Sequence, residues 1–305
     1  MSNSTQTNAE LMKYEGKPSW GAAFPQAMQH VLAMLIGNIT PPMLIAATCG
    51  LSASDKILLT QAAMIIGGIT TLLQLFPVFG FGMKLPNVMG VAFAYMPILT
   101  IIGEQYGIAA IFGSQLVAGF ASIFIGMFIS KIRRFFPPIV SGTVVMSIGL
   151  SLYKTAISYI GGGTAAQNAG TFGSGRFWLL AILTLVVTLA CNFFGKGLLK
   201  ASGMLIGIAV GYAAALFMGD VVSFADLNSA AWFSLPRPFH FGLEFHFDAI
   251  IMMILMYMVQ AVQTIGDVSS TTIGGFGREC TDQELGGAIK GQGICGMIGA
   301  CIGGL

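Results

Sequence analysis

The chain has 305 residues, of which 55% are hydrophobic and only 9% carry a charge. Soluble domains carry a charge on about 25% of their residues. Apolar runs of about 20 residues, enough to span a bilayer, follow one another along the chain, and the mean hydropathy is +0.81. The composition therefore indicates a polytopic helical membrane protein. The net charge of +2 is too small to suggest a nucleic-acid partner, and the basic residues are spread out rather than clustered.

Cysteines and sequence motifs give no sign of a metal site or an enzyme. The five cysteines form no Cys-x-x-Cys pair and mostly lie in or near apolar runs. We expect buried free thiols rather than a disulfide framework or metal ligands. Neither Gly-x-Ser-x-Gly nor His-Glu-x-x-His occurs, so we expect no catalytic residues.

The first third of the chain is expected to hold a tail and four membrane segments. Residues 1–19 are polar and predict a cytoplasmic tail, followed by a span from about Trp20 to Ile45. A second span runs from about Ile57 to Val78. Glycines and prolines interrupt the third segment, Gly80–Gly103, which predicts an extended lead-in and a short half-helix. A fourth span covers about Ile108–Ile129.

Five more spans bring the total to about nine. The longest polar connection, residues 220–247, precedes the eighth span and is expected to be extracellular. The later spans are expected at about Pro138–Ile160, Phe177–Phe194, Leu199–Met218, Ile250–Thr272 and Leu285–Ile302.

The eighth span carries a polar stripe. Gln260, Gln263, Asp267, Ser270 and Thr271 recur at steps of three and four residues, which places them on one face of a helix. A carboxylate in hydrocarbon costs about 2.5–3.5 kcal/mol on insertion scales. The stripe therefore predicts a solute or ion site, and the alternative is a set of polar side chains that only hold helices together.

Basic residues orient the predicted spans. With the N-terminus inside, Lys84, Lys131, Arg133 and Arg278, together with most other Lys and Arg residues, fall on the cytoplasmic side. This distribution follows the positive-inside rule. We expect a multi-pass protein of the cytoplasmic membrane with a cytoplasmic N-terminus.

A short internal repeat links the first and eighth spans. Residues 26–29 (Gln-Ala-Met-Gln) match residues 260–263 (Gln-Ala-Val-Gln). Seven predicted crossings separate the two copies, so the second copy runs through the membrane in the opposite direction. Inverted repeats with broken helices are typical of secondary transporters.

Four segments in the same order resemble the nucleobase–cation symporter-2 family, also called the nucleobase–ascorbate transporters. Residues 29–34 (Gln-His-Val-Leu-Ala-Met) are similar to its first-span Gln-His signature, and residues 90–94 (Gly-Val-Ala-Phe-Ala) to its third-span segment. Residues 232–236 (Trp-Phe-Ser-Leu-Pro) resemble its loop before the eighth span, and Gly266-Asp267 its eighth-span motif. The resemblance extends from Gln29 to the last residue.

The resemblance implies an all-α fold of fourteen spans in two inverted repeats of seven, with broken third and tenth spans. The chain would hold the first nine, and we expect its sequence to be C-terminally truncated. A core domain would comprise residues 20–134 and 248–305, and a gate domain residues 135–219. The family also implies an elevator-type movement of the core against the gate, and a homodimer of the full-length protein.

The resemblance assigns roles to individual residues. Gln263 stands where many members carry a Glu that hydrogen-bonds the base, and its amide offers a donor and an acceptor in one plane. Packing between helices is the alternative role for His30 and Phe93. Substrate contacts are expected from Gln263, Phe93, Gly37 and Ala92. A coupling network is expected from Asp267, His30, Gln29 and Lys290.

Two positions depart from the family pattern. Gln263 cannot titrate, and Lys290 replaces the Asp or Asn that is usual in the ninth span. Asp267 is then the remaining carboxylate within the eighth span. We hypothesise that Lys290 pairs with Asp267 and neutralises its charge, the alternative being a lysine that extends to cytoplasmic water.

These observations predict secondary-active transport of a nucleobase, coupled to a proton or to sodium, without a cofactor and without enzymatic activity. A purine such as xanthine or urate is favoured by the similarity around residues 274–279. A uracil permease of the same family and an anion transporter of the same fold are the alternatives.

Overall fold

A computed structural model describes residues 19–133, 138–195, 199, 203–219 and 236–305, and these residues form helices and loops without a β-strand. Their contacts divide the chain into two compact units. Among the described residues, the first unit holds residues 37–148 and 236–305, and the second holds residues 19–36 and 149–219.

Six helical segments within the described residues are long and apolar enough to cross a membrane. They are Ala53–Leu75, Ile108–Met127, Gly142–Ile160, Gly175–Phe194, Phe247–Phe276 and Asp282–Ile302. The predicted all-α polytopic membrane fold is thereby confirmed. The inverted repeats and the boundaries of core and gate stay predictions.

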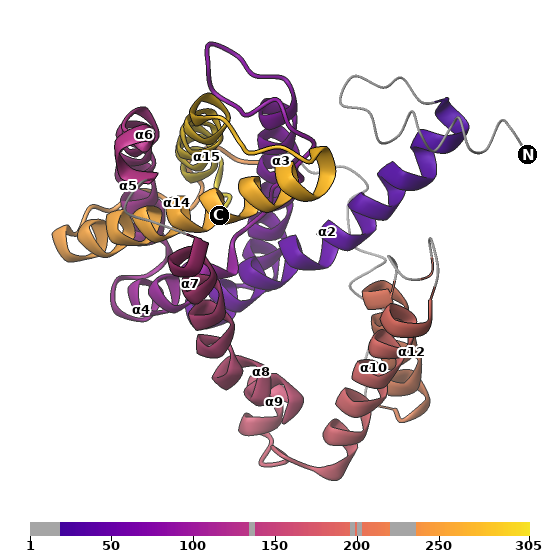
Figure 1. Cartoon of the computed structure of the whole chain (residues 1–305). Coiled ribbons are helices and arrows are strands. Elements are labelled where there is room, and N and C mark those ends of the chain that lie inside the picture. Colours follow the sequence, from indigo (N-terminus) through magenta and orange to yellow (C-terminus); the bar gives the residue numbers. More distant parts are fainter. Residues whose placement is uncertain (1–18, 134–137, 196–198, 200–202, 220–235) are drawn as a thin grey trace, which may run out of the picture. The chain divides into compact units, whose positions relative to one another are not determined.

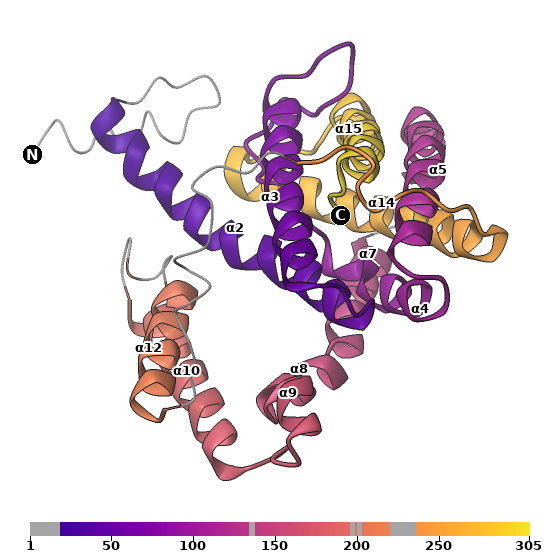
Figure 2. The same ribbon diagram turned by 180° about the vertical axis from the view of Figure 1, so that it is seen from behind.

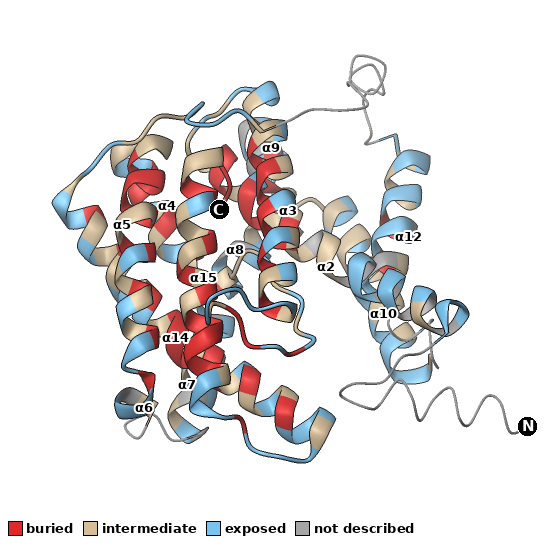
Figure 3. Ribbon diagram, turned by 90° about the horizontal axis from the view of Figure 1, so that it is seen from above, coloured by how far each residue is buried: buried red, intermediate tan, exposed pale blue. Residues whose placement is uncertain are grey.

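The first unit is a bundle around α5 (Ile108–Met127), which packs against α4 (Met96–Tyr106), α14 (Phe247–Phe276) and α15 (Asp282–Ile302). Helix α3 (Ala53–Leu75) packs on the other side of α15, as Figures 1 and 2 show from opposite directions. The unit also contains the end of α2 (Trp20–Thr48), the 3-10 turn η1 (Phe93–Tyr95), α6 (Ile129–Ile132) and the start of α7 (Pro138–Ser151). Buried residues gather on α3, α5, α14 and α15 (Figure 3).

Glycines bring α5 and α15 into backbone contact. A Cβ atom on Gly119 of α5 would lie 2.7 Å from the carbonyl oxygen of Gly293 on α15. Two turns further along, a Cβ atom on Gly126 would lie 3.0 Å from the carbonyl oxygen of Gly286. In lipid, the hydrophobic effect does not drive apolar helices together. Van der Waals contacts between closely packed small residues stabilise their association instead.

The connection from α14 to α15 is closed at both ends by local hydrogen bonds. Helix α14 ends at Gly277, whose φ of 63° lies in the left-handed region that favours glycine. Helix α15 begins with a capping box, in which Thr281 Oγ1 accepts the Glu284 N–H at 3.2 Å and Glu284 Oε2 accepts the Thr281 N–H at 2.8 Å. Arg278 adds a 2.9 Å bond to the same carboxylate.

Residues 76–92, which we call the extended segment, leave the helical conformation between α3 and η1 and pass beside α15. Turns and bends at residues 79–85, with a positive φ at Phe79, Gly80, Gly82 and Lys84, come before a stretch without regular structure. The Gly82 N–H donates to the Gly287 carbonyl at 2.9 Å, and the Gln74 side-chain NH₂ donates to the Ala288 carbonyl at 2.9 Å. Helix α4, which follows, has only 11 residues. The predicted extended lead-in and half-helix are confirmed, and protein packing satisfies the irregular backbone as a membrane interior requires.

The two ends of the first unit differ in their charged pairs. Where α5 and α6 end and α15 begins, Arg133 lies 3.3 Å from Asp282. At the end where α3 begins, His240 Nε2 lies 2.8 Å from Asp55 Oδ1. Lys131 belongs to the first of these ends, where its ammonium lies 5.8 Å from the Phe128 ring centre. The described basic residues therefore gather mainly at the end that the sequence predicts to be cytoplasmic.

The second unit contains the start of α2, the end of α7, α8 (Tyr153–Ile160), α9 (Gly163–Asn168), α10 (Gly175–Phe194) and α12 (Gly203–Phe217). Helices α10 and α12 lie side by side. Gly207 and Gly211 of α12 face Thr188 and Thr184 of α10, and a Cβ atom on either glycine would overlap the facing threonine. Both helices expose most of their side chains (Figure 3).

Candidate functional site

A polar cavity of about 320 Å³ lies in the first unit between α14, α15 and the extended segment. Its walls include all five side chains of the stripe predicted on the eighth span. The lining residues are Asn87, Val88, Met89, Gly90, Ala92, Gln260, Gln263, Thr264, Asp267, Ser270, Thr271 and Gln292. The stripe thus lines a half-open polar hollow, where a carboxylate and amides can be solvated or can bind a solute.

A smaller cavity of about 120 Å³ adjoins the polar one. The two share five wall residues, Met89, Gly90, Ala92, Gln260 and Gln292. The remaining wall of the smaller cavity is largely apolar and aromatic: the rings of Tyr95 and Tyr257 meet edge to face with centres 5.2 Å apart. One side of the shared wall is therefore suited to hydrogen bonds, and the other to the face of a ring.

Two helices hold the extended segment where it forms the cavity wall. The Val91 N–H donates to Asn38 Oδ1 on α2 at 3.0 Å, and the Met89 N–H donates to Thr71 Oγ1 on α3 at 3.0 Å. Between these bonds stands Gly90, where a Cβ atom would overlap Asn38 Oδ1. Glycine at this position lets the backbone pass close to the buried Asn38, so the wall is positioned from outside the site.

The side-chain oxygens of Gln260 and Gln263 are buried and have no hydrogen-bond partner among the described residues. Buried polar groups are nearly always hydrogen-bonded, and leaving one unsatisfied costs about 1–3 kcal/mol. The other buried side-chain atoms without a described partner are on Asn38, Gln61 and Gln74, and none of these lines either cavity. Gln260 and Gln263 thus line the polar cavity, and each has a side-chain oxygen that lacks a donor among the described residues.

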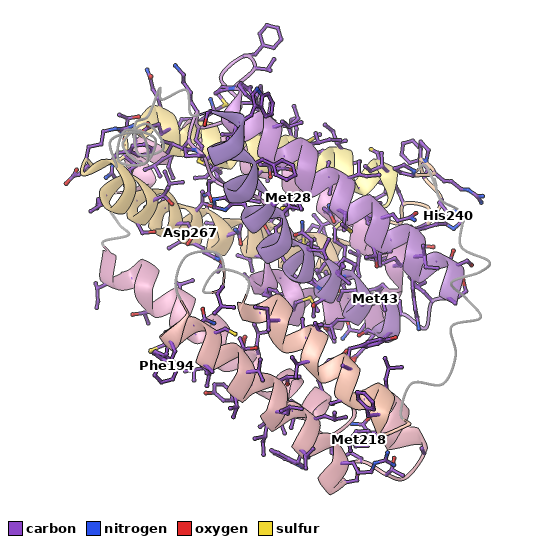
Figure 4. All side chains as sticks on the ribbon, turned by 90° about the vertical axis from the view of Figure 1, so that its right-hand side faces the viewer. Met28, Met43, Phe194, Met218, His240 and Asp267 are labelled. Carbon is purple, nitrogen blue, oxygen red and sulfur yellow. The ribbon has the colours of Figure 1, made fainter. Side chains whose placement is uncertain are left out.

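Asp267 follows Gln263 by one turn and is exposed to the polar cavity. The backbone carbonyl of Asp267 accepts the hydroxyls of Ser270 at 2.9 Å and Thr271 at 2.8 Å. Figure 4 labels Asp267 on α14, well apart from His240. Asp267 is the only carboxylate among the described residues that line the two cavities.

Lys290 lies apart from the cavity that holds Asp267. Its ammonium lies 5.8 Å from the ring centre of Phe81 in the extended segment, and the residue lines neither cavity. The ion pairs found among the described residues do not join Lys290 to Asp267. The hypothesised pair is therefore absent from the described structure, and a role of Lys290 in coupling stays a prediction.

The other predicted site residues fall in three places. Ala92 lines both cavities, whereas Phe93 begins η1 and is half-buried outside their walls. Gly37 precedes Asn38 on α2, and a Cβ atom there would meet no atom within 4 Å. His30 lies on the part of α2 that belongs to the second unit, and is exposed. The Gln29 side chain, and residues 232–235 of the predicted loop motif, lie outside the described residues, so these roles stay predictions.

Sequence reasoning assigned no role to several residues that build the site. Gln292 on α15 lines both cavities, and its Oε1 accepts the Thr264 hydroxyl at 3.0 Å. Asn38 and Thr71 fix the extended segment, as described above. Each is a polar residue in an apolar span, which is the signal that marked the stripe. None of the three belongs to a periodic set, so pattern alone did not select them.

The wall chemistry limits what can bind. Among the described residues, the cavity linings contain no Lys or Arg, and His, Cys, Asp and Glu form no group of three that could hold a metal ion. Amide oxygens, a carboxylate and hydroxyls favour a flat polar solute that offers N–H donors. An inorganic anion would find no cation in these walls.

Comparison with known proteins agrees with this chemistry. The model of a permease family (Xan_ur_permease), the nucleobase–ascorbate transporters, matches residues 21–305. The chain is 36% identical to the uric acid permease PucJ of Bacillus subtilis over 280 residues. This alignment covers 90% of this chain and 62% of PucJ. The chain is 34% identical over 273 residues to the uric acid permease PucK of the same organism, covering 89% and 62%.

A further relative is the xanthine permease XanQ of Escherichia coli, 29% identical over 318 residues, with 100% of this chain and 68% of that protein covered. The chain spans 62% of the length of PucJ and PucK. Because the family model matches nearly the whole chain, the relationship does not depend on any single motif. The chain belongs to the nucleobase–ascorbate transporter family of membrane permeases.

Proposed function

We propose that the protein is a secondary-active purine permease that carries xanthine or urate across the cytoplasmic membrane. The observation that carries the proposal is the Gln263 side-chain oxygen, buried without a described partner in the wall of a polar cavity. The names of the relatives, two uric acid permeases and a xanthine permease, support a purine substrate.

The walls suit a purine in three ways. The Gln263 oxygen accepts a ring N–H. Because this oxygen is buried, a substrate that supplies the donor should bind about 1–3 kcal/mol more tightly than one that does not. Gly90 and Ala92 also line the polar cavity, so the backbone of the extended segment forms part of its wall. The Tyr95 and Tyr257 rings give the neighbouring cavity an aromatic wall. An anion transporter is less well supported, because the described cavity walls lack a cation.

Asp267 is the group that we propose for ion coupling. It faces the cavity, lies one turn from Gln263, and is the only carboxylate among the described wall residues. A carboxylate in this position can take up a proton, or attract sodium, on the side from which the substrate enters. Proton symport is preferred, since the described walls hold no second carboxylate to share a sodium ion.

Orientation, movement and assembly complete the proposal. The N-terminus is placed in the cytoplasm, supported by the basic residues Arg133 and Lys131 at the corresponding end of the first unit. We propose that the substrate crosses by an elevator-type movement of a core against a gate, as the family resemblance implies. A homodimer of the full-length protein is expected from the family.

Uptake of labelled xanthine into cells that lack their own purine permeases tests the function. The full-length protein should mediate saturable uptake that unlabelled urate inhibits and that uracil and sulfate inhibit weakly. Stronger inhibition by uracil would make it a uracil permease, and inhibition by sulfate an anion transporter. Gln263→Met should raise the KM for xanthine roughly 5- to 150-fold. Gln61→Met is the matched control, because the Gln61 oxygen is also buried without a described partner but lies outside both cavities.

A further inference from the structure

We propose that Gln260 is a second hydrogen-bond acceptor for the transported base and that, with Gln263, it selects purines that carry two N–H donors. The inference rests on the proposed function and adds a specificity-determining residue to the same site. In the sequence, Gln260 is only one member of the polar stripe. In the structure it belongs to the wall shared by the two cavities.

Burial and position single out Gln260. Only 8% of the residue is exposed, and its side-chain oxygen has no hydrogen-bond partner among the described residues. It precedes Gln263 by three residues on α14, so the two Cβ atoms lie about 5–6 Å apart on one face. Two amide oxygens one helical turn apart thus face the same space, and neither is satisfied by the protein that surrounds it.

Neighbouring donors in the wall are already engaged elsewhere. The Thr264 hydroxyl lies 2.9 Å from the backbone carbonyl of Gln260 and 3.0 Å from Gln292 Oε1. The Gln292 side-chain nitrogen lies 3.8 Å from Met89 Sδ. Neither donor is bonded to the Gln260 side-chain oxygen. The Gln260 oxygen is therefore left as an acceptor for a solute bound in the cavities.

A glutamine that only joins helices looks different in this same wall. Gln115 on α5 also lines the smaller cavity, but its side-chain nitrogen donates to the carbonyls of Gly296 at 2.9 Å and Gly304 at 3.2 Å. Its amide is used to hold backbone. The Gln260 oxygen, like those of Gln61 and Gln74, has no partner among the described residues, and Gln260 differs from those two in lining both cavities.

The chemistry of two acceptors defines the ligand class. An oxopurine such as xanthine or urate carries several ring N–H groups, so two of them can be matched at once. A base with a methyl group in place of one of these hydrogens leaves one buried oxygen unpaired and adds a steric clash. Sites that bind through hydrogen bonds reject such analogues strongly. We therefore expect two ring nitrogens of xanthine at which methylation weakens recognition, one for each glutamine.

Competition by methylated xanthines tests the inference. Xanthines methylated at each ring nitrogen in turn are used to inhibit labelled xanthine uptake by the full-length protein and by its Gln260→Met variant. Methionine keeps the length of the side chain and removes the acceptor. The variant should bind xanthine roughly 5- to 150-fold more weakly. One of the two methylation penalties seen in the original protein should disappear, while the penalty assigned to Gln263 remains.

Gln260→Glu is the second variant, because glutamate keeps an acceptor at the same position. It should retain the methylation pattern of the original protein, which keeps the inference testable if Gln260→Met fails to reach the membrane. Xanthine uptake with an unchanged pattern in Gln260→Met, or a pattern lost in Gln260→Glu, would overturn the role of Gln260 alone. If no purine is taken up or inhibits uptake, the proposed function fails, and the inference falls with it.

Discussion

Gly90→Ala should damage the wall of the site through Asn38, although Asn38 touches neither cavity. The new Cβ atom would overlap Asn38 Oδ1, which accepts the Val91 N–H at 3.0 Å. Asn38 is only 2% exposed, so its side chain has little room to turn away. To make space it must release Val91, and the extended segment then loses one of the two bonds that hold it at the cavity.

The size of the effect follows from the bond that is lost. An unsatisfied buried group costs about 1–3 kcal/mol, or roughly 5- to 150-fold in the affinity for xanthine if the loss falls on binding. Asn38→Ala should show a loss of the same order, because it also leaves the Val91 N–H without its acceptor. The double variant removes both the overlap and the side chain that causes it. Its loss should therefore be smaller than the sum of the single losses by about 1–3 kcal/mol.

Two measurements on the full-length protein decide the matter: the KM for xanthine uptake, and the thermal unfolding temperature of the purified protein in detergent. Gly68→Ala is the matched control, because a Cβ atom there meets nothing within 4 Å and Gly68 lines neither cavity, and it should change stability by no more than about 0.5 kcal/mol. Additive losses in the double variant, or a Gly90→Ala protein with normal uptake and stability, would refute the role of Asn38 in holding Val91 at the cavity wall.

Three further predictions follow from the site and the packing. Asp267→Asn should abolish the dependence of xanthine uptake on external pH, and an unchanged dependence would remove Asp267 from coupling. Lys290→Met should leave uptake nearly intact and lower stability by about 0.5–1 kcal/mol, the size of a cation–π contact; a large rise in KM would instead place the lysine in the site. Gly293→Ala should lower the free energy of unfolding by about 1–3 kcal/mol, because its Cβ atom would lie 2.7 Å from the Gly119 carbonyl. Gly274→Ala, which meets nothing within 4 Å, should unfold at the original temperature.

Regular patterns in the sequence predicted what depends on local chemistry. Polar residues of the eighth span recur at the period of a helix, so their common face could be deduced, and all five line one cavity. Glycines and prolines between Gly80 and Gly103 predicted a break, because a straight helix there would be unfavourable. The extended segment and the short helix α4 appear where the break was predicted.

Contacts between distant residues could not be read in the same way. Asn38 and Val91 are 53 positions apart, and their bond depends on how closely α2 and the extended segment approach. Lys290 was matched with Asp267 on charge alone. The structure puts it over Phe81, since the extended segment runs along α15 and brings an aromatic ring within reach. Charge complementarity identifies possible partners, but the path of the backbone decides which of them meet.

The backbone bonds between Gly82 and Gly287, and the glycine contacts that join α15 to α5, have a consequence for how a solute can leave. Helix α15 is thereby joined to the extended segment on one side and to α5 on another by backbone atoms, which have no rotamers to change. Neither contact can open by a change of side-chain rotamer alone. Under the proposed transport function, we expect α15, α5 and the extended segment to move as one body when a solute is released.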